Sequence, residues 1–574
     1  MQGDLLLVLV CQLLLTGLPG VAAALLAARW GVRNVPVILA IALAATGVLA
    51  MLGFWSYYAG REVGETFSYL LVFGSILAIV WTLWERRLDP ALLRQLAIPL
   101  GLWALGSLFL VYLGFAHGGT DTPVGTSLTR FSAGSLPSDS GIPNFYTEWF
   151  WANGHSGTPP VFPGEWLVSD RPPLQIGYAL SQRPFSWGMW ELHYQVIGVV
   201  LQQLWIVGLW ALLLAAGLGR RTRALIAIAI LVSPLALLNG FFVWPKLLPA
   251  AMLLAAAALV MTPLWNDLRR NLWAAALVAA LCGVAMLGHG SSIFAIIPLA
   301  LVAAYRGLPS WRWLGIGVLV GIVLMAPWSA FQKYDSPPGN RLTKWMLAGA
   351  DVNEIDDRGT LEAIVDEYRD AGSGQILHYK AQNFVTMAGG GPAVGWLDDA
   401  ATAIGDGDWE LADQNVRNFL FFYFLPSLGL LLAGPIAMAI GWRRGRERQP
   451  EWGFALTSWL VAFVGCVIWG LLLFGSLPAR TVVHAGTYLL PILAMAGAVA
   501  GLRATFPRFA YGLVAVNCVL VLVLYAPSFE PPAGTSYSLL SFLVSGLGLA
   551  GFVWLSVRGE PEPHTVLAGS GVPS

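Results

Sequence analysis

Acidic side chains in a polar stretch of the chain are the first candidates for chemistry. Asp139 lies in a Pro-, Ser- and Gly-rich turn, Leu-Pro-Ser-Asp-Ser-Gly, directly before an aromatic, amphipathic stretch. A carboxylate in this position can project from a loop into a cleft and take a proton from a hydroxyl group. The same context also suits an Asx-turn or a helix cap. The residue type and its spacing leave both roles open.

A second acid and a base follow about thirty residues later in the same stretch. Asp170 and Arg171 precede two prolines, and Pro fixes the backbone beside them. The fork of an arginine can hold a carboxylate or a phosphate, although an internal salt bridge that stiffens the loop explains the pair equally well. Trp149 and Trp166 offer aromatic faces that can stack on a sugar ring or lie in an interfacial aromatic belt.

Basic residues at the ends of apolar runs are candidates for holding an anion. Lys246 follows Trp-Pro, and Arg480, His484 and Tyr488 recur at intervals of four residues, which places them on one helix face. A cation, an imidazole and a phenol aligned in this way suit an anionic phosphate. The alternative for the cations is snorkelling to the membrane interface. For His289, in the tight turn Gly-His-Gly-Ser-Ser, a capping or packing role is favoured.

The composition of the chain indicates that these residues belong to a membrane protein. Of 574 residues, 57% are hydrophobic and 11% are charged, whereas soluble proteins have about 45–50% apolar and about 25% charged residues. A spanning helix needs roughly 20 apolar residues, so we expect an all-α polytopic fold with about 15 transmembrane helices. Lys plus Arg and Asp plus Glu are both 32, and this balance argues against a nucleic-acid partner. The cysteines lie in apolar runs without a metal-binding spacing.

Charge asymmetry predicts the orientation. Short Arg-rich loops alternate with acidic segments, so the positive-inside rule places the N-terminus outside and the C-terminus in the cytoplasm. Two long loops then fall outside, and apolar spacing predicts a short amphipathic helix at 359–371. We divide the chain into five parts: a three-helix extension (1–95), a seven-helix core (96–331) that includes outer loop 117–192, a second outer loop (332–416), a five-helix bundle (417–557) and a cytoplasmic tail (558–574).

Residues 96–500 resemble the GT-C superfamily of integral-membrane glycosyltransferases. The layout of a helix, a long outer loop, six further helices and a second long loop is similar to that family. Four motifs are similar to those of bacterial members of unassigned substrate: Leu-Pro-Ser-Asp at 136–139, Ser-Asp-Arg-Pro-Pro-Leu at 169–174, Trp-Pro-Lys at 244–246 and Arg-Leu-Thr-Lys-Trp at 341–345.

The resemblance implies an inverting hexosyl- or pentosyltransferase of the bacterial inner membrane, with its active site on the periplasmic or extracellular face. The donor would be a polyprenyl-phosphate-linked sugar, and the acceptor a cell-envelope glycan, lipid or protein. Asp139 would be the general base, with Asp121 in Gly-Thr-Asp-Thr-Pro as the alternative. Lys246, Arg480 or His484 would hold the lipid phosphate. Asp170 would be a second acid that binds the acceptor or helps to hold a divalent cation; the metal and cofactor requirement is otherwise left open.

A transporter or flippase of lipid-linked glycans is the alternative function. Such a protein would carry ionisable residues near the middle of the bilayer, where charge is costly and therefore functional. The apolar runs of this chain hold few charges, and its acids gather in the two long loops. This distribution favours an enzyme that works at one membrane face.

Overall fold

The computed structural model of the chain describes residues 2–84, 88–132, 136–163, 166–351, 354, 356–387, 392–423, 425–475, 488–527 and 537–558. Within these ranges the secondary structure is helical apart from one isolated bridge between Phe162 and Trp166. The predicted all-α class is therefore confirmed, and the protein is a polytopic membrane protein.

The number of spans is lower than predicted when judged by helix length. Among the described residues, nine helices are long and apolar enough to cross a membrane, or ten if one bent pair forms a single span. Five shorter apolar helices occupy further predicted positions. The count of fifteen is not confirmed, because apolar composition marks these shorter helices as clearly as it marks the long ones.

The N-terminal part contains four long helices, and a side-chain cap begins two of them, α2 and α4. The Asn34 side chain accepts a hydrogen bond from the Val37 amide at 3.2 Å, and the Asp89 side chain accepts one from the Ala91 amide at 2.8 Å. Such caps satisfy amides that the first helical turn leaves unpaired. The helices are α1 (Gln2–Arg29), α2 (Val35–Ala59), α3 (Arg61–Trp84) and α4 (Pro90–Gly114).

The first long loop is built of short helices. Proline begins several of them, since its fixed φ and missing N–H suit the first helical turn. The elements are α5 (Pro123–Thr129), η1 (Ser138–Gly141), α6 (Ile142–Asn153), η2 (Val168–Asp170), α7 (Leu174–Gln182) and η3 (Arg183–Phe185).

The central helices include a broken one. The chain bends by 57° between α10 and α11, where Ser233 caps α11 and Pro234 begins it. The central elements are α8 (Trp190–Gln202), α9 (Trp205–Ala215), α10 (Arg220–Leu231), α11 (Pro234–Phe242), α12 (Leu247–Val260), α13 (Trp265–Leu268), α14 (Leu272–Gly288), η4 (Gly290–Ser292), α15 (Ile293–Arg306) and α16 (Trp311–Tyr334).

The second long loop and the C-terminal part complete the chain. The helix predicted at 359–371 is confirmed as the first part of α18, which has a break at Gly372, where φ is 68°. The elements are α17 (Arg341–Ala348), α18 (Thr360–Met387), α19 (Pro392–Asp406), α20 (Trp409–Tyr423), α21 (Leu425–Arg443), η5 (Arg446–Arg448), α22 (Pro450–Leu472), α24 (Leu489–Thr505), α25 (Pro507–Tyr525) and α26 (Leu539–Arg558).

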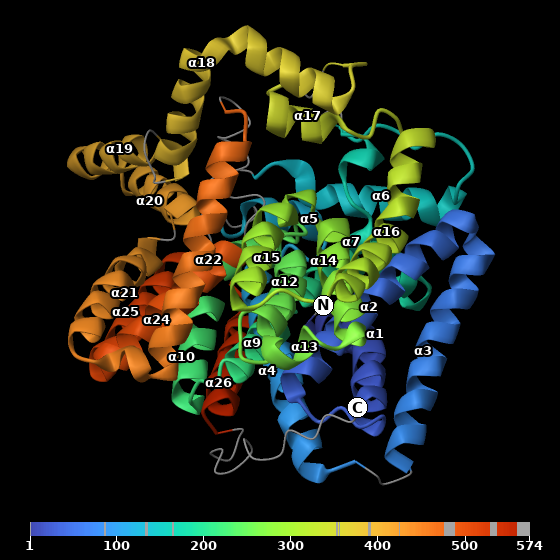
Figure 1. Cartoon of the computed structure of the whole chain (residues 1–574), viewed down its shortest axis with the longest axis horizontal. Helices are drawn as coiled ribbons and strands as arrows, with labels where there is room; N and C mark the ends of the chain where they lie inside the picture. The colour runs from blue at the N-terminus through green and yellow to red at the C-terminus, as the bar shows by residue number, and fades with distance from the viewer. Residues whose placement is uncertain are drawn as a thin grey trace.

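The two long loops share one end of the helix bundle. In Figure 1, α6 of the first loop and α17 and α18 of the second lie at the top, whereas the connection from α3 to α4 lies at the bottom. That both loops lie on one side of the membrane, and which side of the cell they face, stay predictions.

A buried arginine fixes the first loop to distant helices. The Arg130 guanidinium is 2% exposed and donates to the carbonyls of Leu113 and Gly114 at the end of α4. It also donates to the carbonyls of Tyr525, the last residue of α25, and of Ala526 and Pro527, which follow it. Carbonyls at helix C-termini lack partners within the helix and carry partial negative charge, so they suit a buried cation.

Candidate functional site

The candidate site begins with a buried ion pair in the first loop. Asp139, in η1, is 8% exposed, and its Oδ1 accepts from Nη2 of Arg171 at 3.1 Å. The Arg171 guanidinium lies 4.3 Å from the centre of the Trp166 ring, over its face. Three of the predicted site residues therefore lie together. The sequence-based alternative for Arg171, an internal salt bridge that stiffens the loop, is thus present, but its partner is Asp139 and not the neighbouring Asp170.

Two further basic groups, Lys246 and His289, belong to the same site as this ion pair. Lys246 is 4% exposed, lies over the Trp244 ring at 3.8 Å and makes a hydrogen bond to Nε2 of His289. Burial lowers the pKa of Lys246 well below its ordinary value, with the positive charge of Arg171 adding to this and Asp139 opposing it. Since Lys246 is buried within the protein, snorkelling to the interface does not explain its position.

His289 is both a cap and a member of this cluster. Its Nδ1 accepts from the Ser291 amide at 3.2 Å and so caps η4, as the tight turn predicted. Burial lowers the pKa of the His289 imidazole, and the charges of Lys246 and Arg171 lower it further. The cluster thus consists of one carboxylate, Asp139, and three basic groups, Arg171, Lys246 and His289. They lie on two segments of the first loop and at two helix breaks, α11 to α12 and α14 to η4.

Several buried polar atoms of the cluster residues and of residues within two positions of them in the sequence lack a partner within the described chain. They are Oγ of Ser140, Oγ of Ser169, Nε of Arg171 and Nε1 of Trp244. Buried polar groups are normally hydrogen-bonded, and an unsatisfied one costs about 1–3 kcal/mol. Two of these atoms are N–H donors beside a lysine, so the site is suited to a ligand that carries oxygen acceptors and negative charge.

Buried glutamines and a tyrosine position the two halves of the cluster. Tyr194 Oη donates to the carbonyl of Ser140 at 2.6 Å and accepts from Nε2 of Gln175 at 3.2 Å. Gln202 links Gln175 to α12: its Nε2 lies 3.4 Å from Gln175 Oε1, and its Oε1 accepts from the first two amides of α12. This hydrogen-bonded path runs from the residue after Asp139 to the helix that begins after Lys246.

The backbone before Lys246 is strained. Val243 has a φ of 53°, a left-handed conformation that is rare for a β-branched residue. Its carbonyl accepts from Nε2 of Gln175 at 3.0 Å, and its side chain packs over Gly198, where a Cβ would lie 2.6 Å away. Such strain costs of order 1–3 kcal/mol and persists where the surroundings enforce it, commonly at functional sites.

Asp170 has partners of a different kind. It is 5% exposed; its Oδ2 accepts from Nη2 of Arg341 at 2.6 Å and from the Leu167 amide at 2.8 Å. Gln332 adds a second bridge between the loops, with its Nε2 donating to the carbonyls of Ser169 and Gly339. These contacts favour a positioning role for Asp170, because it joins the two loops next to Arg171.

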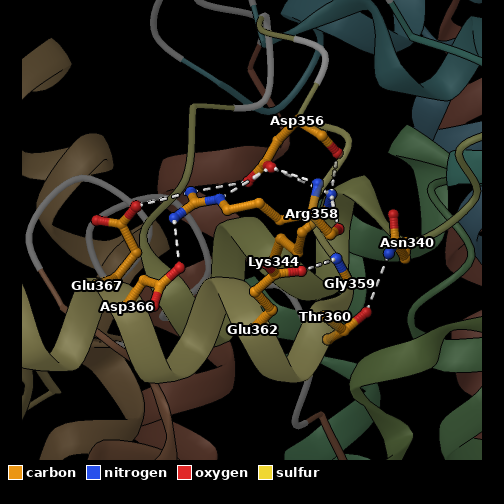
Figure 2. Close-up of polar contacts among 9 residues, drawn as sticks. All are labelled: Asn340, Lys344, Asp356, Arg358, Gly359, Thr360, Glu362, Asp366 and Glu367. Atoms are coloured by element: carbon orange, nitrogen blue, oxygen red, sulfur yellow. Dashed lines mark hydrogen bonds and ion pairs between the residues drawn. The ribbon is translucent and has the colours of Figure 1, made fainter.

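A charged cluster in the second loop holds α17, which carries Arg341. Figure 2 shows Arg358 at its centre, in ion pairs with Asp356, Asp366 and Glu367. Lys344 of α17, which is 2% exposed, donates to the carbonyls of Asp356 and Arg358. Part of the acidic run of the second loop is therefore used in fixing α17 to the start of α18.

The other predicted site residues lie elsewhere or outside the described residues. Tyr488 is buried, and its hydroxyl donates to Oδ1 of Asn239 at 2.6 Å, which joins α24 to α11. Arg480 and His484 lie outside the described residues. Trp149 is half-buried in α6 and lines a separate cavity. Asp121, the alternative base, is exposed in the turn before α5.

Sequence reasoning missed the roles of Trp244, His289 and Arg341. Trp244 and Arg341 stand in motifs that the sequence singled out, but the motif alone does not reveal their partners. His289 is separated from Lys246 by 43 residues. Its only local signal is the position of a histidine at the end of an apolar run, where α14 stops and η4 begins.

The pH dependence of anion binding should report on Lys246. A protonated amine attracts anions, and burial lowers the pKa of Lys246, so we expect the affinity for a lipid phosphate to fall as pH rises, well before an ordinary lysine would lose its charge. Lys246→Arg keeps its charge across this range and should flatten the profile. Native mass spectrometry of lipid-bound protein over a pH series measures this. A wild-type profile that stays flat into alkaline pH contradicts the assignment of Lys246 to the anion.

Comparisons with known proteins add no family assignment. Among the described residues, no group of three or more His, Cys, Asp or Glu side chains is arranged to hold a metal ion. No protein-family model, curated protein or solved structure matches the chain. The conclusion from fold and comparisons is that the chain is a polytopic all-helical membrane protein.

Proposed function

We propose that the protein is a membrane glycosyltransferase that moves a sugar from a polyprenyl-phosphate donor to a cell-envelope acceptor on the outer face of the bacterial inner membrane. The observation that carries the proposal is the buried Asp139 beside Arg171 and Lys246, among polar atoms without partners. The resemblance of the motifs around Asp139, Arg171 and Lys246 to GT-C glycosyltransferases supports it.

The geometry fits direct displacement at the sugar carbon. Arg171 holds Oδ1 of Asp139, and we assign Oδ2 to take the proton from the acceptor hydroxyl. The acceptor oxygen then forms the new bond to the sugar carbon while the bond to the lipid phosphate breaks, so the configuration inverts. Lys246, Nε of Arg171 and Nε1 of Trp244 would bind the phosphate oxygens, where charge increases as the bond breaks.

Two observations favour the alternative function, a transporter or flippase of lipid-linked glycans. Two buried polar pairs join α1 to other helices: Gln12 bonds to His193 at 2.8 Å, and Gln182 bonds to Thr16 at 3.0 Å. The broken pair α10–α11 adds a discontinuous helix, a feature of many transporter binding sites. Both features lie among packed helices, whereas the charged cluster lies at one end of them.

An assay with the purified protein in liposomes separates the two functions. Radiolabelled polyprenyl-phosphate sugar is supplied with an extract of cell-envelope acceptors, and two products are followed: label in the acceptor and label moved between leaflets. The proposal expects acceptor labelling that depends on the protein. Movement of the intact lipid between leaflets, with no acceptor labelled by any extract, would establish the alternative instead.

A further inference from the structure

A cavity beside the candidate base has the chemistry of a sugar-binding site. It has a volume of about 450 Å³, within the range of about 300–1,000 Å³ typical of small-ligand sites. It lies against one side of α6 and the end of η1, the element that carries Asp139. The lining residues used below are Gly141, Asn144, Phe145, Glu148, Trp149 and Phe162.

The walls are aromatic rings that remain partly exposed. Phe145, Trp149 and Phe162 are half-buried, and the Phe145 and Phe162 rings pack edge to face at 5.4 Å. Rings fixed in this way present apolar faces of defined orientation. The C–H face of a sugar ring packs well against such a surface, and its hydroxyl groups remain at the edges for hydrogen bonds.

The polar groups of the cavity are oriented by partners outside it. Glu148 accepts from Nε of Arg183 at 2.8 Å and from Nη2 at 3.3 Å, and its side chain is still 43% exposed. Asn144 Oδ1 accepts from Nε1 of Trp190 at 2.8 Å, which fixes the amide so that its NH₂ group remains a donor. A fixed carboxylate and a fixed amide together accept from and donate to hydroxyl groups.

The cavity offers no cation to an anion. Among its described lining residues Glu148 is the one charged side chain, and its carboxylate is balanced by the ion pair with Arg183, so the lining suits a neutral ligand better than a phosphate. The cationic cluster around Lys246 supplies the opposite environment. Since Gly141 is two residues after Asp139, the two environments meet at η1. This separation matches a reaction between a phosphate-linked donor and a neutral, hydroxyl-bearing acceptor.

We infer that this cavity binds a neutral sugar unit of the acceptor, so that the acceptor is a glycan. The statement that the bound sugar belongs to the acceptor rests on the proposed function. Binding of a sugar in the cavity does not depend on it. Trp149 would stack on the ring, and Glu148 and Asn144 would bind its hydroxyl groups.

Saturation-transfer NMR on the full-length protein in lipid nanodiscs tests the inference. Nanodiscs are needed because maltoside detergents would themselves present a sugar. The probes are the methyl glycosides of glucose, galactose, mannose and arabinose. We expect at least one to bind. Its affinity should fall roughly two- to tenfold in Trp149→Ala and about tenfold or more in Glu148→Gln. Trp187→Ala, an exposed aromatic of the same loop outside the cavity lining, is the matched control and should leave binding unchanged.

The possible outcomes separate this inference from the proposed function. Failure of every glycoside to bind, or equal binding in the wild type and both cavity variants, overturns the sugar site. Asp139→Asn should keep glycoside binding, because it leaves the cavity lining intact. If that variant also transferred sugar normally, the proposed base would be wrong and the sugar site would still stand.

Discussion

Asp139→Asn is expected to lose sugar transfer by about 10²–10⁴-fold, because a positioned general base contributes about that factor. The amide keeps the size of the side chain and an oxygen that can accept from Arg171, so expression and thermal stability should stay close to the wild type. Initial rates of label transfer to the acceptor, with donor saturating, measure the effect.

Two further carboxylates of the same region complete that experiment. Glu191→Gln removes an exposed acid at the start of α8 and should leave transfer unchanged. Asp121→Asn tests the alternative base, which is exposed and lies outside the cluster. Normal transfer by Asp139→Asn together with a large loss in Asp121→Asn would move the base to Asp121.

Arg341→Met is expected to destabilise the protein by about 3–5 kcal/mol, since it leaves a buried carboxylate without its partner. Arg341 and Asp170 are 8% and 1% exposed at the side chain, and their closest atoms are 2.6 Å apart. The double variant Asp170→Asn/Arg341→Met removes both charges and should recover much of the loss. Apparent unfolding temperatures in detergent measure both effects.

The matched control for this pair lies in the same loop. Arg369 pairs with Asp366 at 3.4 Å but is 72% exposed, and exposed ion pairs contribute about 0–1 kcal/mol. Arg369→Met should therefore change the unfolding temperature little. If the double variant were as unstable as the sum of its two single variants, Asp170 and Arg341 would not act as a pair, and the link between the loops would need another explanation.

The local sequence predicted individual helices and candidate site residues better than it predicted which residues contact one another. The acidic turn at Asp139, the cation of Arg171 and the Trp-Pro-Lys motif identified three residues that the fold brings together. Asp139 and Arg171 stand out as charged residues beside proline in a polar, aromatic-rich loop, and Lys246 stands out because it begins an apolar run. The amphipathic spacing at 359–371 likewise predicted the start of α18, since that signal depends on neighbours three and four residues apart.

Long-range pairing could not be predicted in the same way. Asp170 and Arg341 are 171 residues apart, and nothing near either residue indicates the other. The expectation that Asp170 pairs with Arg171 followed sequence distance, whereas the η2 turn directs the two side chains to different partners. The span count differed for a related reason: apolar composition gives the extent of a hydrophobic run, but packing determines where a helix breaks within it.

The contacts of Arg130 set the order in which the protein can be completed during synthesis. Its carbonyl partners after α25 are 395 to 397 residues away in the sequence. At a translation rate of about 5–20 residues per second, roughly 20–80 s pass between the synthesis of Arg130 and the synthesis of these partners. The C-terminal part also reaches back through α26, where Ser545 Oγ donates to the Phe109 carbonyl of α4. Until both segments are inserted, Arg130 anchors the first loop to α4 alone, so we expect the candidate site to reach its final arrangement only after the C-terminal helices have entered the membrane.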